Sequence, residues 1–126
     1  MKTVKIPNSD HPITIERNSS RIRVTVAGRV VADTTRALTL RESDYPPVQY
    51  VPLEDVDMSL LQRSENQSYC PYKGDAAYYS VTIGGSRGKN VVWTYEAPYE
   101  AVADIKDHLA FYANRVDSIE ETPNVT

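Results

Sequence analysis

Residues 21–34, RIRVTVAGRVVADT, determine the fold class that this sequence predicts. Apolar residues alternate with arginine and threonine from Ile22 to Val26, a glycine follows at Gly28, and a second apolar run comes directly after it. Successive side chains of a β-strand point to opposite faces, so alternation with a period of two indicates a strand that is buried on one face. Two such runs around a glycine predict a β-hairpin.

Similar patterns extend outward from this hairpin. Strands are predicted in four further segments, which are 11–17 (HPITIER), 37–42 (ALTLRE), 76–83 (AAYYSVTI) and 90–96 (NVVWTYE). The last two segments flank residues 84–89, GGSRGK, whose glycines predict a hairpin connection. Residues 45–52, YPPVQYVP, are predicted to be extended, because residues before proline avoid the helical region, and their prolines favour an edge strand or a sheet corner.

Two segments predict helical structure. In residues 53–65, Asp55 or Asp57 is expected to cap one or two helical turns. From Pro98 to Ala113 apolar residues recur at helical spacing, with a proline in the first turn, and this pattern predicts one amphipathic α-helix packed against the sheet. About eight short strands followed by one C-terminal α-helix indicate a mainly β fold.

The chain has 126 residues, which favours a single domain over residues 1–126. A domain of this size buries enough surface to form one core without disulfides. The first residues form no regular pattern, and residues 118–125 are acidic and polar. We therefore expect both ends to fray and the ordered core to span about residues 11–117.

The composition excludes several classes of partner and cofactor. The net charge of −3 provides no positive field for nucleic acid or an anionic membrane, so neither partner is expected. One cysteine and two distant histidines do not make a four-ligand zinc site, and no metal or other cofactor is expected. No segment is as long and apolar as a membrane span or a signal peptide, so a cytoplasmic location is expected, with Cys70 reduced. The oligomeric state is not determined by the sequence.

Two short motifs resemble catalytic signatures and fail in detail. A phosphate-binding loop that ended at Lys89 would require glycine where the chain has Ile83, and serine or threonine where it has Asn90. Asp55 and Asp57 would share one face of a strand and could hold a divalent metal, but a helix-capping role is also open to them.

Residues 69–80, YCPYKGDAAYYS, contain the only cysteine, a lysine three residues later and four of the nine tyrosines. Cys70 precedes a proline and is expected to be extended, with Lys73 nearby across a turn that closes at Gly74. A neighbouring ammonium lowers the pKa of a thiol and creates a nucleophile, whereas the alternative is a small buried apolar residue. Lys73 is interpreted as a ligand for an anion, a partner of Asp75 or a surface lysine.

Two further residues have open interpretations. The guanidinium of Arg36, between two predicted strands, is suited to bind a carboxylate or phosphate through two parallel hydrogen bonds. The alternative is a structural ion pair with one of three acids, Glu42, Asp44 or Asp55. His108 flanks the apolar stripe of the predicted helix, where it is either a packing residue or a catalytic base.

Aromatic residues provide the strongest functional signal. They concentrate between residues 45 and 99, where they are Tyr45, Tyr50, Tyr69, Tyr72, Tyr78, Tyr79, Trp93, Tyr95 and Tyr99. A tyrosine hydroxyl that is buried without a partner costs free energy, so packing alone does not explain this preference for tyrosine over phenylalanine. If the strands that contain Tyr78 and Trp93 pair, one face carries Trp93, Tyr95 and one of the adjacent tyrosines. Such a face either lines a ligand pocket or stabilises the sheet by cross-strand pairing.

Several long segments together resemble one bacterial family, domain of unknown function 427. They are RVVADTTRALTLRE (29–42), YPPVQYVPLEDVDMSLL (45–61), YCPYKGDAAYYSV (69–81), VVWTYEAPYEAVADIKDHLAFY (91–112) and RVD (115–117). The resemblance implies a β-tent (Mss4-like) fold, in which two small antiparallel sheets meet at an angle. Many relatives with that fold carry paired CxxC zinc knuckles, which this chain lacks. The family also carries a nucleotidyltransferase label, which implies a Gly-Ser turn before the acidic pair, whereas here Gly85-Ser86 follows Asp55 and Asp57.

These observations lead to one hypothesis and two alternatives. The leading hypothesis is a small cytoplasmic protein that binds a small polar or anionic ligand in an aromatic-lined pocket. The predicted ligand-binding residues are Arg36, Tyr50, Cys70, Tyr72, Lys73, Tyr79, Trp93 and Tyr95. One alternative is an enzyme that uses Cys70 as its nucleophile, activated by Lys73 and His108. The other is a protein-interaction adaptor with an exposed sheet edge near residues 45–47.

Overall fold

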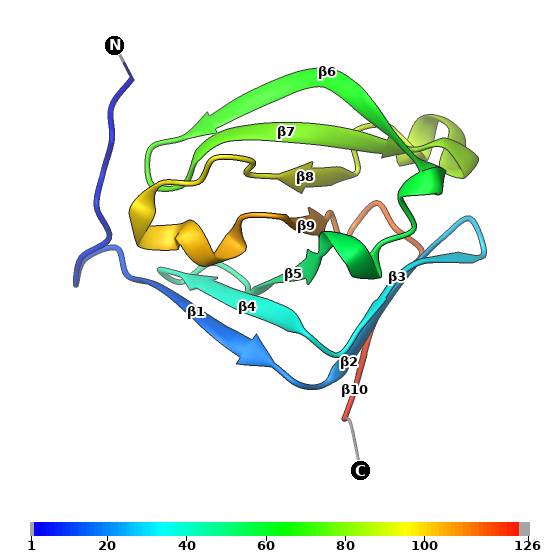
Figure 1. Ribbon diagram of the computed structural model, residues 1–126, viewed down its shortest axis with the longest axis horizontal. Coiled ribbons are helices and arrows are strands. Elements are labelled where there is room, and N and C mark those ends of the chain that lie inside the picture. Colours follow the sequence, from blue (N-terminus) through cyan, green and yellow to red (C-terminus); the bar gives the residue numbers. More distant parts are fainter. Residues whose placement is uncertain (1, 124–126) are drawn as a thin grey trace.

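The computed structural model describes residues 2–123, and it consists mainly of antiparallel β-sheet (Figure 1). In spatial order the strands of the larger sheet are β1 (Ile13–Asn18), β4 (Ala37–Glu42), β5 (Val48–Pro52), β9 (His108–Phe111), β8 (Val92–Thr94), β7 (Gly74–Val81) and β6 (Leu61–Cys70). The smaller sheet contains β10 (Ser118–Thr122), β2 (Arg21–Val26) and β3 (Arg29–Thr34). The predicted mainly β class is confirmed.

The hairpin predicted at residues 21–34 is confirmed, and it connects the two sheets. Strands β2 and β3 pair around Ala27 and Gly28, whose φ values of 51° and 79° suit a two-residue turn that follows the twist of the strands. At the other end of this ladder, β2 follows β1 and β4 follows β3 after short breaks, and β1 pairs with β4. The paired chain therefore bends out of one sheet and into the other (Figure 1).

Short 3₁₀ segments connect several of the strands. They are η1 (Leu53–Asp55), η2 (Met58–Leu60), η3 (Thr82–Gly88) and η4 (Glu100–Ile105). The turns predicted within residues 53–65 are confirmed as η1 and η2, and the Asp57 side chain caps η2 by accepting a hydrogen bond from the Ser59 N–H. Strands β7 and β8 pair as predicted, and η3 forms much of their connection.

The α-helix predicted from Pro98 to Ala113 is wrong. Among the described residues this segment contains η4 and then β9, and between them Asp107 has a φ of 62°, which does not occur inside a right-handed helix. The apolar residues at helical spacing are buried, but they come from different elements. Backbone pairing of β9 with both β5 and β8 replaces the hydrogen bonds of a helix, and this pairing between distant segments leaves no trace in the local pattern.

Two predictions about sheet edges and chain ends also need correction. Strand β5 lies between β4 and β9 rather than at an edge, because Pro46 and Pro47 precede the strand and its remaining proline is its last residue. Residues 118–122 form β10 rather than a frayed end, since they pair with β2 and Ile119 packs against the core. The expected fraying beyond residue 123 lies outside the described residues.

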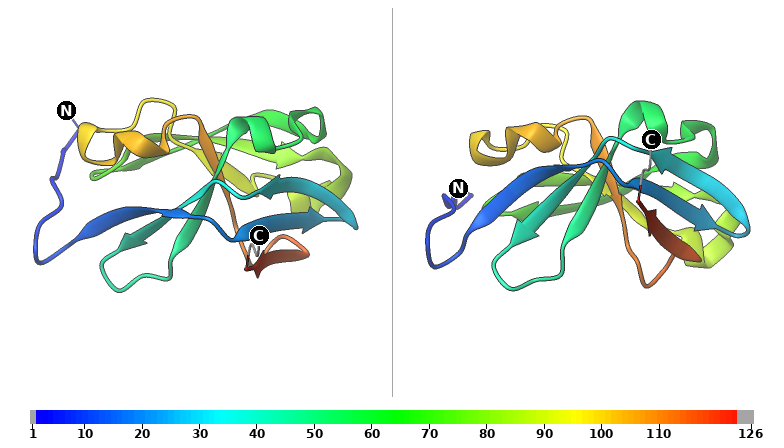
Figure 2. Two further views of the ribbon diagram at one scale, coloured as in Figure 1. Left: turned by 60° about the horizontal axis from the view of Figure 1, so that its bottom comes forward. Right: turned by 90° about the horizontal axis from the view of Figure 1, so that it is seen from below.

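The two faces of the larger sheet have different roles. One face packs with the smaller sheet into an aliphatic core that includes Val24 and Val31 from the hairpin and Leu109 from β9. The opposite face carries a second cluster around Tyr50, which η4 covers with buried apolar side chains. In both views of Figure 2, η4 (gold) lies toward the left and the smaller sheet (blue, cyan and red) toward the right. The aromatic residues of the second cluster form the candidate site.

Candidate functional site

An aromatic face is formed where strands β5, β9, β8 and β7 lie side by side. Tyr78 is the register partner of Trp93, so these two rings share one face, whereas Tyr79 packs against the aliphatic core on the other. The Trp93 Nε1–H donates to the Tyr50 hydroxyl at 3.3 Å, and the rings of Trp93 and Tyr112 lie 4.4 Å apart between centroids. Alternation left open which of two adjacent tyrosines joins Trp93, and Tyr79 was the one predicted to bind the ligand. That choice is wrong, because the register places Tyr78 beside Trp93 and in the cavity lining.

The aromatic face borders a cavity of about 220 Å³, here named the inner cavity. Six aromatic residues line it, which are Tyr45, Tyr50, Tyr78, Trp93, Tyr95 and Tyr112. Burial raises the pKa of the Tyr50 and Tyr95 hydroxyls, so both stay protonated at neutral pH and act as hydrogen-bonding groups. Glu42 and Lys73 are the charged residues in this lining.

Glu42 and Lys73 form a largely buried ion pair in the lining of the inner cavity. Lys73 Nζ donates to Glu42 Oε1, and His11 Nε2 lies 2.8 Å from Glu42 Oε2. Burial by itself raises the pKa of Glu42, but the hydrogen bonds from Lys73 and His11 outweigh it and hold the pKa below its ordinary value. His11 in turn stacks on Tyr72, with ring centroids 4.1 Å apart. The carboxylate is therefore ionised at neutral pH, and its charge balances that of Lys73.

The ammonium of Lys73 has donor capacity that the described residues do not use. It carries three hydrogens, and Glu42 is the one acceptor that the structure provides within residues 2–123. The face of the Tyr95 ring lies 5.9 Å from Nζ, and none of the side-chain hydrogen bonds among the described residues involves the Tyr95 hydroxyl. Since Lys73 is only 9% exposed, water has little access to these donors, and a hydrogen-bond acceptor inside the cavity would be stabilised there.

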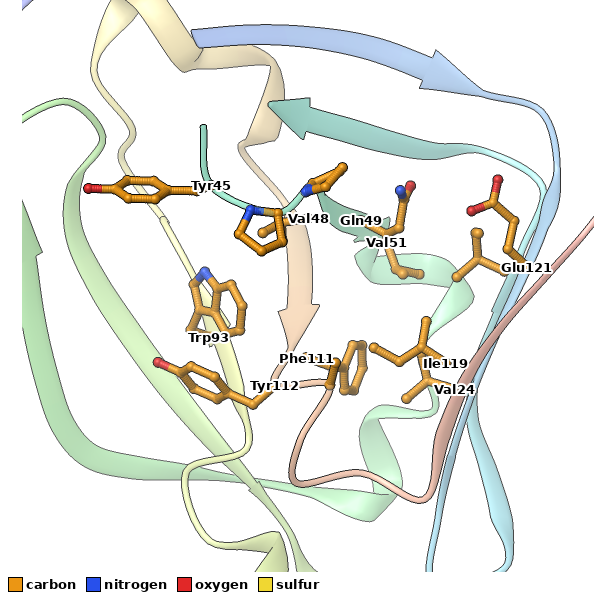
Figure 3. Close-up of a pocket in the computed structure, with 14 residues that line it drawn as sticks. Val24, Tyr45, Val48, Gln49, Val51, Trp93, Phe111, Tyr112, Ile119 and Glu121 are labelled. Atoms are coloured by element: carbon orange, nitrogen blue, oxygen red, sulfur yellow. The ribbon is translucent and has the colours of Figure 1, made fainter. Parts of the chain in front are cut away.

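An outer groove of about 560 Å³ adjoins the inner cavity (Figure 3). Apolar side chains from both sheets line it, among them Val24, Val51, Phe111 and Ile119. Figure 3 shows Trp93 and Tyr112 toward one end of the groove and Glu121 toward the other. Five residues line both spaces and make them neighbours: Tyr45, Pro46, Val48, Trp93 and Tyr112.

The structure brings together half of the predicted ligand-binding residues. Tyr50, Lys73, Trp93 and Tyr95 line the inner cavity. Cys70 is half-buried and packs against the same aromatic cluster, and Tyr72 stacks on the histidine that contacts Glu42. Cys70 ends β6 and the turn closes at Gly74, as predicted, but the partner of Lys73 is Glu42, while Asp75 pairs with Lys2.

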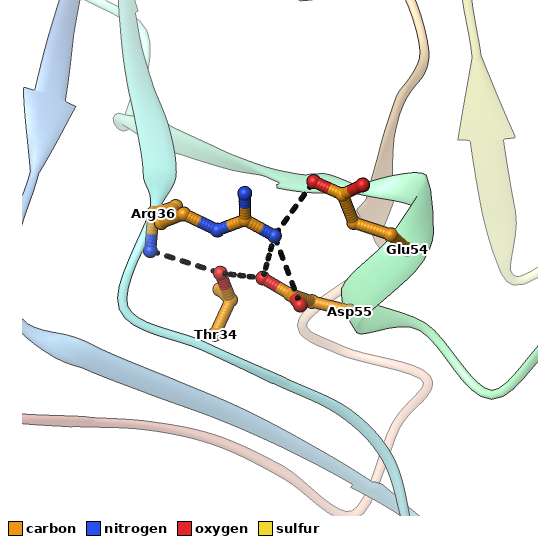
Figure 4. A network of polar contacts seen from close by, with 4 residues as sticks. All are labelled: Thr34, Arg36, Glu54 and Asp55. Carbon is orange, nitrogen blue, oxygen red and sulfur yellow. Dashed lines mark hydrogen bonds and ion pairs between the residues drawn. The ribbon is translucent and has the colours of Figure 1, made fainter.

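Arg36 lies apart from Lys73, at the bend between the sheets (Figure 4). Its Nη2 donates to Glu54 at 2.7 Å and to Asp55 at 3.1 Å, and these bonds raise the pKa of its guanidinium. The predicted alternative of a structural ion pair with Asp55 is confirmed. Arg36 and His108 line a shallow cavity of about 470 Å³, named the corner cavity, which does not include Cys70 or Lys73.

Thr34 is the buried centre of the contacts in Figure 4. Its hydroxyl donates to Asp55 Oδ2 at 2.7 Å and accepts from the Arg36 N–H at 2.9 Å, and the residue is 3% exposed. We expect Thr34→Val to lower the free energy of unfolding by about 1–2 kcal/mol, because valine keeps the shape but leaves both partners unpaired. Chemical denaturation measures this loss. Thr14→Val, at an exposed strand position, is the control, and equal losses in both variants would contradict the role of Thr34.

The acidic pair considered as a metal site is already engaged in other contacts. Asp55 binds Arg36 and Thr34, and Asp57 caps η2 through Ser59. The described residues contain no group of three or more potential metal-ligating side chains, and none of their helices is long and apolar enough to cross a membrane. The residues that line the inner cavity can form hydrogen bonds and aromatic contacts.

Sequence reasoning missed several residues of this site. Glu42 was considered only as a partner of Arg36, His11 only as one of two distant histidines that make no zinc site, and Tyr112 was assigned to a helix. A usable signal was present for Glu42, because it continues the alternation of residues 37–42 on the face of Leu38 and Leu40. No local pattern indicated that His11 or Tyr112 would reach the same cavity.

Comparison with known proteins matches residues 14–122 to a family described as domain of unknown function (DUF427). The matched range includes every residue that lines the inner cavity and the outer groove. No curated protein matches the chain.

Proposed function

We propose that this chain, which belongs to the DUF427 family, binds a small-molecule ligand. The family description assigns no activity, so the proposal rests on the contacts of the residues that line the inner cavity. Membership confirms the resemblance in the sequence. The proposed ligand is a small molecule that places a polar, acceptor-bearing group in the inner cavity and an apolar or aromatic part in the outer groove. The observation that carries this proposal is the unused donor capacity of the buried Lys73 ammonium inside an aromatic cavity.

The charge of the site favours a neutral acceptor over an anion. Glu42 compensates Lys73, and the predicted second cation, Arg36, lies at the corner cavity with its own acids. A carboxylate in the inner cavity would add a negative charge beside Glu42, and a desolvated like charge is costly. A carbonyl or carboxamide oxygen accepts from Lys73 and the Tyr95 hydroxyl without that cost.

The aromatic wall supplies contact area for the rest of the ligand. Trp93, Tyr112 and Val48 line both the inner cavity and the outer groove. Concave apolar sites with a few polar groups are the usual form of small-molecule sites. A planar ligand would stack against the rings and extend toward the aliphatic part of the groove.

A matched set of probes tests this proposal. Benzamide, benzoate and benzylamine carry the same ring with a neutral, an anionic and a cationic group. Because Trp93 is the only tryptophan, its fluorescence reports occupancy of this site. We expect benzamide to change the emission saturably and to bind about tenfold more tightly than either charged probe, which corresponds to roughly 1.4 kcal/mol. No saturable change with any of the three would refute the proposal.

Two phenylalanine substitutions separate occupancy of the cavity from general effects. Val48→Phe fills the boundary between the inner cavity and the outer groove and is expected to weaken benzamide binding by about tenfold or more. Val30→Phe makes the same change at a strand position that is 44% exposed and lines neither space, and it is expected to leave binding unchanged. Melting curves establish that both variants are folded.

Other parts of the proposal go beyond these contacts. The β-tent architecture, the cytoplasmic location and the lack of nucleic-acid and membrane partners stay predictions from the sequence. No contact of the described residues favours the cysteine-dependent enzyme or the adaptor over simple binding. Tyr45 at the proposed adaptor edge is 59% exposed, but it also lines both the cavity and the groove, where the binding proposal gives it a role.

A further inference from the structure

A cavity of about 380 Å³, named the amide cavity, shares Tyr78 and Tyr112 with the inner cavity. Its remaining lining residues are Asn66, Asn90, Asn114 and Arg115. It therefore presents one cation, three carboxamides and two phenols, and no carboxylate. The outer groove, the inner cavity, the corner cavity and the cavity around Arg63 each include at least one carboxylate. Although the chain has a net charge of −3, the lining of the amide cavity carries a positive charge.

Arg115 differs from the arginines that hold the fold together. Arg21, Arg36 and Arg63 each donate to carboxylates at 2.7 Å. Arg115 is half-buried, and within the described residues its side chain reaches only the Ser86 carbonyl, with Nη2 at 3.4 Å. A bond of that length is at the weak limit, so most of the five donors of this guanidinium remain available.

The donors around the amide cavity match an oxyanion with several acceptor oxygens. A guanidinium presents two parallel N–H groups to such an anion, and carboxamide N–H groups and the Tyr112 hydroxyl can add further hydrogen bonds. The Tyr78 hydroxyl already pairs with Ser68 Oγ at 2.8 Å. Asn114 and Arg115 come from the turn after β9, Asn90 from the turn before β8 and Asn66 from the irregular part of β6, so the tertiary structure brings these three segments together. A phosphate group has more acceptor oxygens than a carboxylate and suits this number of donors better.

We propose that the amide cavity binds a phosphate group, with Arg115 as its principal ligand. The site is separate from the acceptor position at Lys73, and its occupancy does not depend on the ligand proposed for the inner cavity. The phosphate comes either from free inorganic phosphate or from a phosphate monoester whose organic part rests on the ring of Tyr112.

Titration calorimetry with two probes, inorganic phosphate and phenyl phosphate, tests the proposal against sodium chloride at equal ionic strength. We expect saturable binding of phosphate, and Arg115→Gln is expected to weaken it about tenfold or more. If the source is a monoester, phenyl phosphate binds more tightly than inorganic phosphate, and if it is the free anion, the two bind alike. Absence of saturable binding for both probes would overturn the proposal.

Arg87→Gln is the matched control. Arg87 is exposed and contacts the Arg115 carbonyl through Nε at 3.4 Å, but it does not line the amide cavity. Arg87→Gln is expected to change phosphate affinity by less than about twofold. An effect as large as that of Arg115→Gln would show that phosphate binds only through general charge attraction, and it would overturn the proposal. If Arg115→Gln does not fold, Arg115→Lys serves instead. It keeps the positive charge but removes the two parallel N–H donors, and it is expected to bind phosphate more weakly than the native chain. Val48→Phe should leave phosphate affinity unchanged, which distinguishes this site from the one at Lys73.

Discussion

Lys73→Met is expected to lower the free energy of unfolding by about 3 kcal/mol at neutral pH, because it removes the ammonium partner of the largely buried Glu42 carboxylate and leaves His11 as its hydrogen-bond partner. The side chains of Lys73 and Glu42 are 11% and 12% exposed, so solvent does little to compensate the unpaired charge. Chemical denaturation measures the loss. Replacing both partners, as Lys73→Met with Glu42→Leu, should recover most of it, because no buried charge then remains.

The dependence on pH gives this prediction a second readout. The pKa of Glu42 lies below its ordinary value of 4.5, so ionised Glu42 stabilises the fold at neutral pH. That contribution is complete above the pKa of the unfolded chain and disappears as the pH falls through the lower, folded pKa. The difference in stability between the native chain and Lys73→Met should therefore shrink below about pH 4.5. A difference that stays constant down to about pH 3 would show that Lys73 acts through packing alone.

Gly88→Ala is expected to destabilise the fold by roughly 3 kcal/mol, at the upper end of what overpacking costs. Gly88 is buried at the end of η3, where a Cβ would lie 2.3 Å from the Val81 carbonyl oxygen. That oxygen belongs to the backbone at the end of β7, so relief of the clash requires the connection between β7 and β8 to move. Thermal and chemical denaturation measure the loss.

Gly28→Ala separates the clash from the cost of replacing a glycine. Gly28 has a φ of 79°, and a Cβ added there would have no atom within 4 Å, so alanine meets only the strain of a left-handed backbone. We expect a loss of about 1–2 kcal/mol. If Gly88→Ala were no more destabilising than Gly28→Ala, the close approach to Val81 would not limit the residue at position 88.

The sequence located much of the candidate site, because chemistry and strand alternation are local properties. Tyr50, Trp93 and Tyr95 were recognised from their residue types, and Lys73 from its place in the turn after Cys70. Alternation also limited the partner of Trp93 to Tyr78 or Tyr79. The choice between those two depended on the register of β7 against β8, and a shift by one residue would have placed Tyr79 in the cavity instead.

Arg36 and the segment from Pro98 to Ala113 show where local patterns fail. Arg36 was a reasonable anion ligand by type, but η1 brings Glu54 and Asp55 to it at the bend between the sheets. The spacing of apolar residues after Pro98 suited a helix equally well, and only the available edges of β5 and β8 made β9 a strand. In both cases the deciding partners are distant in sequence.

The sequence by itself determined the mainly β class, the hairpin at residues 21–34, the turns that follow β5 and the aromatic character of the site. These features follow from alternation, turn residues and side-chain type, which act within a few residues. The tertiary structure alone decided that Glu42 neutralises Lys73, that Tyr112 joins the aromatic wall, and that Arg115 faces three asparagines without a carboxylate. Each of these contacts joins segments whose approach is set by the pairing of whole strands, and the free energy of that pairing is shared over the entire sheet.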